Sequence, residues 1–177
     1  AASRLAGDRS HVGRILLELA GFDHEAGRLP TAREKYLEAL DALRRCGDRR
    51  FEGVALGFLG CVRQELGETA SALEDFDASI AIHRDGEDRR YEGIFAGYRG
   101  TLHHERGNAI AAAAAYGRAV AALHEVGDPR SAALFVGFRA ALDAAEGRFP
   151  SAREGLDEAA DVLTADTTLS PLVEAFR

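Results

Sequence analysis

Residues 47–53 read GDRRFEG, and residues 87–93 read EDRRYEG, 40 positions later. The same step leads to Gly7-Asp8 on one side and to Gly127-Asp128 on the other. Four more columns keep this period: a glycine, a small residue, a large and mostly aromatic residue, and a second small residue (Gly27, Gly67, Gly107, Gly147; Ala32, Ala72, Ala112, Ala152; Tyr36, Phe76, Tyr116, Leu156; Ala39, Ser79, Ala119, Ala159). The chain therefore reads as one domain, residues 1–177, built from four tandem repeats (about 7–46, 47–86, 87–126 and 127–166).

Each repeat is predicted to form two helices. The glycine in the middle of a repeat suits the left-handed position that ends a helix, and the Gly-Asp junction suits the end of one helix and the N-cap of the next. Helices B have one apolar side, whereas helix A of the second repeat is apolar almost all round, as expected of a helix sandwiched between neighbours. We therefore expect an all-α, right-handed α-solenoid. Its helices A are predicted near 9–26, 49–66, 89–106 and 129–146, and its helices B near 30–46, 69–85, 109–126 and 149–164.

The two ends of the chain continue this pattern. Residues 1–6 are interpreted as the tail of a preceding helix B, and residues 167–177 as the start of a fifth unit or a capping helix. Ser170 and Pro171 suit the N-cap and the first position of that helix. Together with the absence of methionine, these features suggest a piece of a longer protein.

Composition narrows the class of protein. A formal net charge of −7 disfavours a nucleic-acid-binding surface. No apolar stretch is long enough to span a bilayer, and no signal-peptide pattern opens the sequence. Two cysteines, Cys46 and Cys61, do not make a disulfide framework. We expect reduced thiols in a cytoplasmic protein.

At this point the repeats resemble the tetratricopeptide family. The second repeat places Leu56, Leu59-Gly60, Ala72, Phe76 and Ser79 at the spacings of the family pattern. The third repeat does the same (Gly100, Ala112, Tyr116, Ala119). The period is 40 residues, against about 34 in the standard unit. Polar residues also replace the aromatic column of helix A (Asp23, Arg63, His103, Asp143). Large residues occupy a different column of the same helix instead (Phe58, Tyr98, Phe138).

Repeats of this length with Gly-Asp-Arg-Arg junctions are similar to those of bacterial multidomain signalling proteins. There they follow nucleotide-switch ATPase modules, serine/threonine kinase domains or LuxR-type DNA-binding regulators. The resemblance implies a protein-interaction scaffold or sensor array, which binds a protein or peptide segment along its concave helix A face. It implies neither an enzyme nor a cofactor. The alternative is a structural spacer that associates with itself through its repeat ends.

Candidate chemistry elsewhere has simpler explanations. His103-His104-Glu105 lacks a histidine partner at i, i+4, so no metal site is expected. Cys61 has no spaced histidine that would activate it as a nucleophile. The carboxylates of helices B fit a solvated outer face. The junction arginines would suit a phosphate or acidic peptide, but pairing with nearby carboxylates is preferred (Arg9, Arg49, Arg50, Arg89, Arg90, Arg130; Asp8, Asp48, Asp88, Glu52, Glu92).

Glycines at Gly53, Gly57 and Gly60 form a stripe on helix A of the second repeat, at a cost to helix stability. Close packing of successive helices A is the preferred interpretation, and the alternative is that the stripe floors a shallow groove for a partner's backbone. Aligning the family's groove positions favours a binding site with an acidic border that prefers basic ligands (Arg14, Leu17, Gly21, His24; Val54, Gly57, Cys61, Gln64; Ile94, Gly97, Thr101, His104; border Glu25, Glu65, Glu105). The competing interpretation turns three aromatic residues toward the partner as anchors (Phe58, Tyr98, Phe138).

Overall fold

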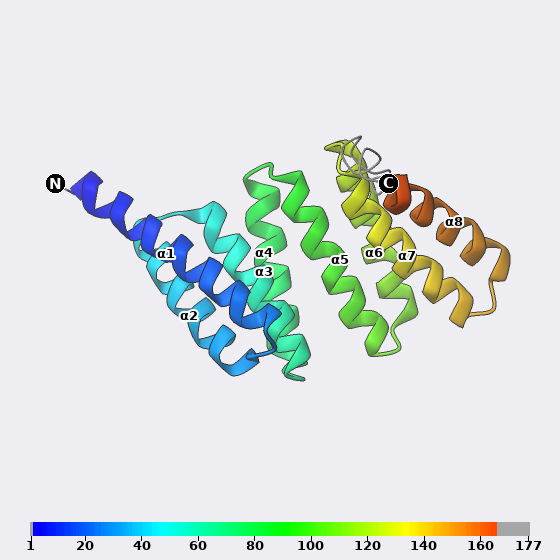
Figure 1. Cartoon of the computed structure of the whole chain (residues 1–177), viewed down its shortest axis with the longest axis horizontal. Coiled ribbons are helices and arrows are strands. Elements are labelled where there is room, and N and C mark those ends of the chain that lie inside the picture. Colours follow the sequence, from blue (N-terminus) through cyan, green and yellow to red (C-terminus); the bar gives the residue numbers. More distant parts are fainter. Residues whose placement is uncertain (1, 166–177) are drawn as a thin grey trace, which may run out of the picture.

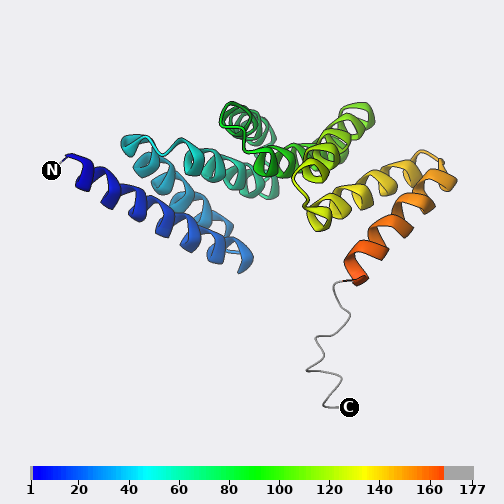
Figure 2. The ribbon, with the colours of Figure 1, turned by 90° about the horizontal axis from the view of Figure 1, so that it is seen from above.

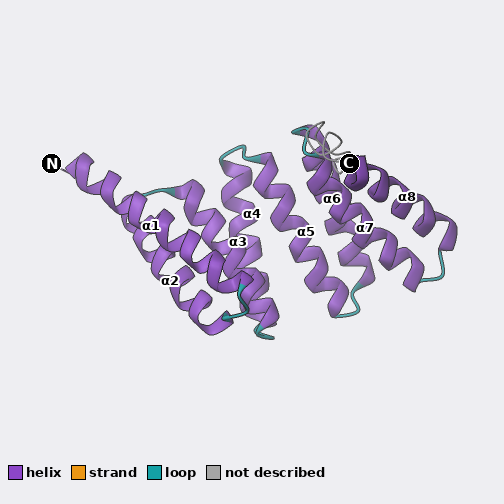
Figure 3. Ribbon diagram, viewed as in Figure 1, coloured by secondary structure: helices purple, strands orange, loops and turns teal. Residues whose placement is uncertain are grey.

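The chain folds as a row of helix pairs. In the computed structural model, the backbone is described for residues 2–165 and the side chains for residues 10–164. Short loops join the helices of this part, which contains no strand (Figures 1 and 3). None of its helices is both long and apolar enough to cross a membrane. Four helices A alternate with four helices B (A: α1 Ala2–Glu25, α3 Arg49–Glu65, α5 Arg89–Glu105, α7 Pro129–Ala145; B: α2 Leu29–Cys46, α4 Thr69–Asp85, α6 Ala109–Glu125, α8 Phe149–Ala165).

The helices pack in series. Each described helix contacts the helix before it and the helix after it, and successive helices A also contact one another. Viewed from above, the pairs follow one another along the long axis (Figure 2). This is the arrangement of an α-solenoid, in which each repeat is stabilised by its neighbours. The predicted fold is confirmed, and the predicted bounds of α2–α8 are correct to within one residue at each end.

Helix α1 differs from the prediction. It runs without interruption from Ala2 to Glu25, through Gly7-Asp8, where the sequence predicted a junction between two helices. The expectation of a separate helix tail at residues 1–6 is therefore wrong. The expected helix at residues 167–177 lies outside the described residues.

Aspartates at the repeat junctions connect one repeat to the next. Asp48, Asp88 and Asp128 each accept a hydrogen bond from a backbone N–H in the first turn of the following helix A, as predicted for an N-cap. Their second oxygen accepts from the preceding repeat. The donors are Ser10 at 2.6 Å, Arg50 at 2.9 Å and Arg90 at 2.8 Å, respectively. One carboxylate thus caps a helix and fixes the position of the neighbouring repeat.

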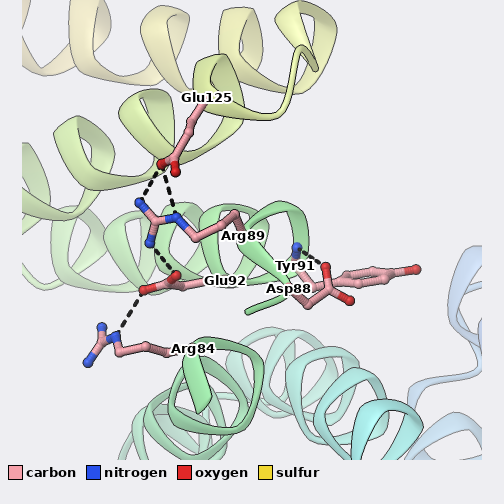
Figure 4. Close-up of polar contacts among 6 residues, drawn as sticks. All are labelled: Arg84, Asp88, Arg89, Tyr91, Glu92 and Glu125. Carbon is pink, nitrogen blue, oxygen red and sulfur yellow. Dashed lines mark hydrogen bonds and ion pairs between the residues drawn. The ribbon is translucent and has the colours of Figure 1, made fainter. Parts of the chain in front are cut away.

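Buried glutamates form ion pairs with other junction arginines. Glu92 lies between Arg84 and Arg89, and Arg89 also binds Glu125 (Figure 4). Glu52 lies in the same way between two arginines of its own junction. The preferred interpretation, pairing with carboxylates, is confirmed for four of the junction arginines (Arg49, Arg50, Arg89, Arg90). Several of these pairs cross from one repeat to the next.

Left-handed residues end the helices where the sequence predicted glycine. Gly27, Gly67, Gly107 and Gly147 between the helices of each pair have φ between 71° and 78°. Between pairs, Gly47 and Gly127 do the same. Glu87 takes this role at the junction between α4 and α5, with φ 55°. A side chain in this conformation costs about 1–2 kcal/mol, so this junction is backbone-strained compared with those at Gly47 and Gly127.

Polar residues replace the family's aromatic residue near the end of each helix A (Asp23, Arg63, His103, Asp143). Asp23 binds Lys35 of α2, whereas Arg63 binds Asp75 of α4 at 2.7 Å. The two pairs join corresponding positions with reversed charge. Lys35 and Arg28 hold the pKa of Asp23 below its usual range, whereas burial raises the pKa of Asp75 to about 6. Ion pairs thus hold these helices together where an aromatic ring is expected.

His83 is a polar residue at a core position. The corresponding residues of the first and third repeats are Leu43 and Leu123, and all three are essentially inaccessible to solvent. The His83 ring stacks on Tyr91 and on Phe95, with ring centroids 5.2 Å and 5.8 Å away. Its Nδ1 lies 3.9 Å from Asp88, while its Nε2 has no hydrogen-bond partner among the described residues. Burial lowers the pKa of His83 despite this carboxylate.

We expect His83→Leu to raise the free energy of unfolding by about 1–3 kcal/mol, because an unsatisfied buried nitrogen is removed. The gain should grow on acidification. The unfolded chain takes up a proton near pH 6.5, whereas the folded chain resists protonation to lower pH, so the wild type loses stability as the pH falls below about 6.5. Urea unfolding at about pH 7.5 and pH 5 measures the difference. The raised pKa of Asp75 changes the stability with pH in the opposite direction. Asp75 is present in both proteins, so its contribution cancels in the difference between them.

The exposed His124 provides the control, since His124→Leu removes no buried polar group and should leave the free energy of unfolding almost unchanged. A gain for His83→Leu that is equal at the two pH values would contradict the proposed titration.

Candidate partner-binding groove

A groove of about 500 Å³ lies along the helices A. All four of these helices contribute, and positions 40 residues apart recur in the lining (His24, Glu25, Phe58, Cys61, Gln64, Glu65, Tyr98, Thr101, Glu105, Phe138). Because equivalent residues of successive repeats lie side by side in a solenoid, the periodic sequence produces a continuous surface.

Aromatic rings form the apolar part of the groove. Phe58, Tyr98 and Phe138 occupy one column and are half-buried. Rings underneath hold the first two edge-on. Phe95 lies 5.5 Å from Phe58, and Phe135 lies 5.8 Å from Tyr98, between ring centroids. The groove aromatics are therefore held in position by packing before any ligand arrives.

Polar side chains cross the groove from repeat to repeat. His24 Nε2 lies 2.6 Å from Glu65. Gln64 donates hydrogen bonds to Glu105 at 2.8 Å and to Thr101 at 3.3 Å. Glu65 remains 52% exposed. The border is thus acidic and still accessible to donors from a ligand.

Cys61 lies in the groove wall but is almost completely buried. Burial raises the pKa of its thiol to about 12, so the thiolate needed for nucleophilic chemistry does not form near neutral pH. Both cysteines are free thiols, and among the described residues no cluster of His, Cys, Asp or Glu could hold a metal ion.

The structure brings together parts of both sequence interpretations. Four residues of the aligned set line the groove (His24, Cys61, Gln64, Thr101), and so do all three alternative anchors (Phe58, Tyr98, Phe138). Val54 is buried, and Arg14 lies 4.3 Å above the Phe51 ring. Four others stand outside the cavity lining and are half-buried (Leu17, Gly21, Ile94, His104).

Gly57 and Gly97 do not floor an open groove, and the expectation that they do is wrong. A Cβ on Gly57 would stand 2.2 Å from the Phe95 ring, and one on Gly97 would stand 2.2 Å from the Phe135 ring. The glycines therefore admit an aromatic ring from the next helix A, which is the packing interpretation. Sequence reasoning missed Phe95 and Phe135, although each follows its glycine by 38 residues.

A row of helix pairs with an open groove on one side defines a helical-repeat protein. Residues 11–85 match the family model described as tetratricopeptide repeat. Repeats of this family generally mediate protein–protein interactions. No curated protein matches the sequence.

Solved structures share the fold, and 87 chains match. One is the crystal structure of BtubC (BKLC) from P. vanneervenii, with a TM-score of 0.76 and 18% sequence identity. The match covers 90% of this chain and 66% of that chain, so this chain spans just under two thirds of that protein. At this identity the likeness concerns the fold alone.

We expect Gly57→Ala to lower the free energy of unfolding by at least about 2 kcal/mol, because the added methyl group overlaps the Phe95 ring and overpacks the interface. Chemical denaturation followed by circular dichroism measures the change.

Gly117→Ala is the matched control, because nothing lies within 4 Å of the added Cβ. It should be neutral or stabilise by up to about 1 kcal/mol through helix propensity. A tolerated Gly57→Ala would restore the open-floor interpretation.

Proposed function

We propose that this chain is a protein-interaction scaffold whose groove binds a basic segment of a partner protein. The observation that carries the proposal is the pairing of a preorganised aromatic floor with an acidic border. Phe58 and Tyr98 line the groove, where aromatic rings attract a guanidinium or ammonium group, and Glu65 and Glu105 line it with them. A net charge of −7 adds a long-range attraction for cations.

The wider setting is proposed from the resemblance of the repeats. The 40-residue period and the Gly-Asp-Arg-Arg junctions are similar to those of bacterial multidomain signalling and regulatory proteins. We place the chain in such a protein, in the cytoplasm, without an enzymatic activity or cofactor of its own. The groove would then report the presence of a partner segment to the rest of that protein.

An arginine- and lysine-rich synthetic peptide tests the groove, with the same peptide carrying glutamates as comparison. We expect only the basic peptide to bind, and the double variant Glu65→Gln, Glu105→Gln to bind it about tenfold more weakly, since two rim charges together are worth about 1.4 kcal/mol. Tyr98→Ala should weaken binding further by removing a ring face. Isothermal titration calorimetry measures the affinities.

Glu154→Gln with Asp157→Asn removes the same charge from the exposed surface of α8, which contributes no residue to the groove lining. This control should bind like the wild type. Equal loss in both double variants would mean that net charge, and not the groove, attracts the peptide.

A second candidate function, a self-associating spacer, is favoured by one feature of α1. Four large apolar residues form an exposed stripe at i, i+3, i+7 and i+10 (Val12 52%, Ile15 55%, Leu19 44%, Phe22 65%). Forty residues later, Ala55, Leu59 and Val62 occupy three of these positions and are buried in one core cluster with residues of the preceding helix pair. The stripe thus has the shape of a surface that another repeat covers.

If the spacer function holds, the apparent mass should rise with protein concentration, and Ile15→Asp with Leu19→Asp should abolish the rise. Multi-angle light scattering measures the mass. The matched control is Ile110→Asp, at an apolar residue that is 86% exposed on α6. A wild type that stays monomeric at high concentration would leave the spacer function without support.

A further inference from the structure

A second cavity, of about 360 Å³, lies between α4, α5 and α6. Its polar lining consists of four arginines and two carboxylates (Arg84, Arg89, Arg99, Arg118; Asp77, Glu92), and we refer to it as the arginine pocket. The groove uses Tyr98, Thr101 and Glu105 of α5. At 100° per residue the pocket residues of α5 fall on the opposite side of this helix. The two cavities are therefore separate sites.

The equivalent junction one repeat earlier shows which residues occupy these positions when their role is only structural. One repeat earlier, the positions of Ala96 and Ala122 are occupied by Leu56 and Ile82. Leu56 is 4% exposed and belongs to the apolar core cluster against which Ile82 packs. Two large side chains thus fill the earlier junction, and two methyl groups leave the later one hollow.

Charged residues replace apolar ones at the same junction. Arg99 stands where the earlier junction has the buried Leu59, and Arg118 stands where it has Ala78. Asp77 takes the position of Leu37. Smaller apolar residues and additional charged residues thus occur together in one cavity. Either change alone weakens a repeat interface.

The charges in the pocket do not balance. Glu92 is shared by Arg84 and Arg89, and Arg89 is also bound by Glu125 outside the pocket (Figure 4). Arg99 Nε lies 2.7 Å from Asp77 Oδ1. Arg118 forms no hydrogen bond or ion pair with any side chain in residues 10–164 and lines the cavity wall. One guanidinium is thus available to an anion.

We propose that the arginine pocket binds a small oxyanion that carries a short apolar group, with the oxyanion on Arg118 and the apolar group on the alanine side of the cavity. A guanidinium binds phosphate and carboxylate oxygens in a bidentate manner. A cavity of about 360 Å³ lies in the range of small-ligand sites. Ala96, Ala122 and Ile80 provide the apolar surface. This site goes beyond the proposed groove function and does not depend on it.

Phenyl phosphate is the first probe, with inorganic phosphate and benzyl alcohol as its two separate halves and a glutamate-rich peptide as a protein-derived source of oxyanions. We expect saturable binding of phenyl phosphate that is stronger than binding of either half. Arg118→Gln should weaken it by at least about tenfold, because the charge-assisted pair is lost. Arg106→Gln, at an exposed arginine just beyond α5, should have no effect. Calorimetry gives the affinities, and NMR chemical-shift changes give the location.

The double variant Ala96→Leu, Ala122→Ile restores the residues of the earlier junction. It should abolish phenyl phosphate binding and raise the melting temperature. Undiminished binding in this variant or in Arg118→Gln would overturn the site, as would a wild type that binds none of the probes. Binding of the acidic peptide without phenyl phosphate would overturn the small-ligand proposal in favour of a protein partner.

Discussion

The close approach of successive helices A is the constraint on which the rest of the structure depends. Gly57 and Gly97 leave room for the rings of Phe95 and Phe135, both essentially inaccessible to solvent. A glycine within a helix costs about 1 kcal/mol relative to alanine, and burial of an aromatic ring contributes about 2–3 kcal/mol. The buried ring outweighs the helix cost of the glycine only when the next repeat supplies that ring. A helix with these glycines is therefore stable because it is part of an array.

The same contact determines the groove. Because Phe95 and Phe135 fill the glycine positions, the concave surface is formed by the neighbouring column of Phe58 and Tyr98. Each of these rings packs at nearly a right angle against the phenylalanine that joins its repeat to the next. An interface that stabilises the array therefore also fixes the ligand-facing rings, and a loosened interface would affect recognition as well as stability.

Local signals explain why most of the fold could be predicted. The N-cap Asp48 and the left-handed Gly67 act within a few residues, so the helix bounds follow from the sequence alone. Which apolar face of helix A is open depends instead on how adjacent repeats rotate against each other. The family alignment selected Val54, which is buried, whereas Phe58 lines the groove. Only the 38-residue spacing of Gly57 and Phe95 could have indicated which face is open. That spacing joins two different repeats, so no pattern within a single repeat shows it.

Departures from the period are informative because all repeats face the same structural demands. Positions that keep the period, such as the aspartate caps, are explained by those demands. His83 breaks the period where the other three repeats have leucine (Leu43, Leu123, Leu163), and it introduces a buried polar group without improving the packing. Arg99 and Arg118 differ from Leu59 and Ala78 one repeat earlier, while the fourth repeat again has charged residues at these two positions (Arg139, Glu158). Helices α4–α6 thus combine a leucine-to-histidine exchange, a strained junction at Glu87 and a hollow lined by arginine. Packing alone does not account for the histidine, because the other repeats fill its position with leucine.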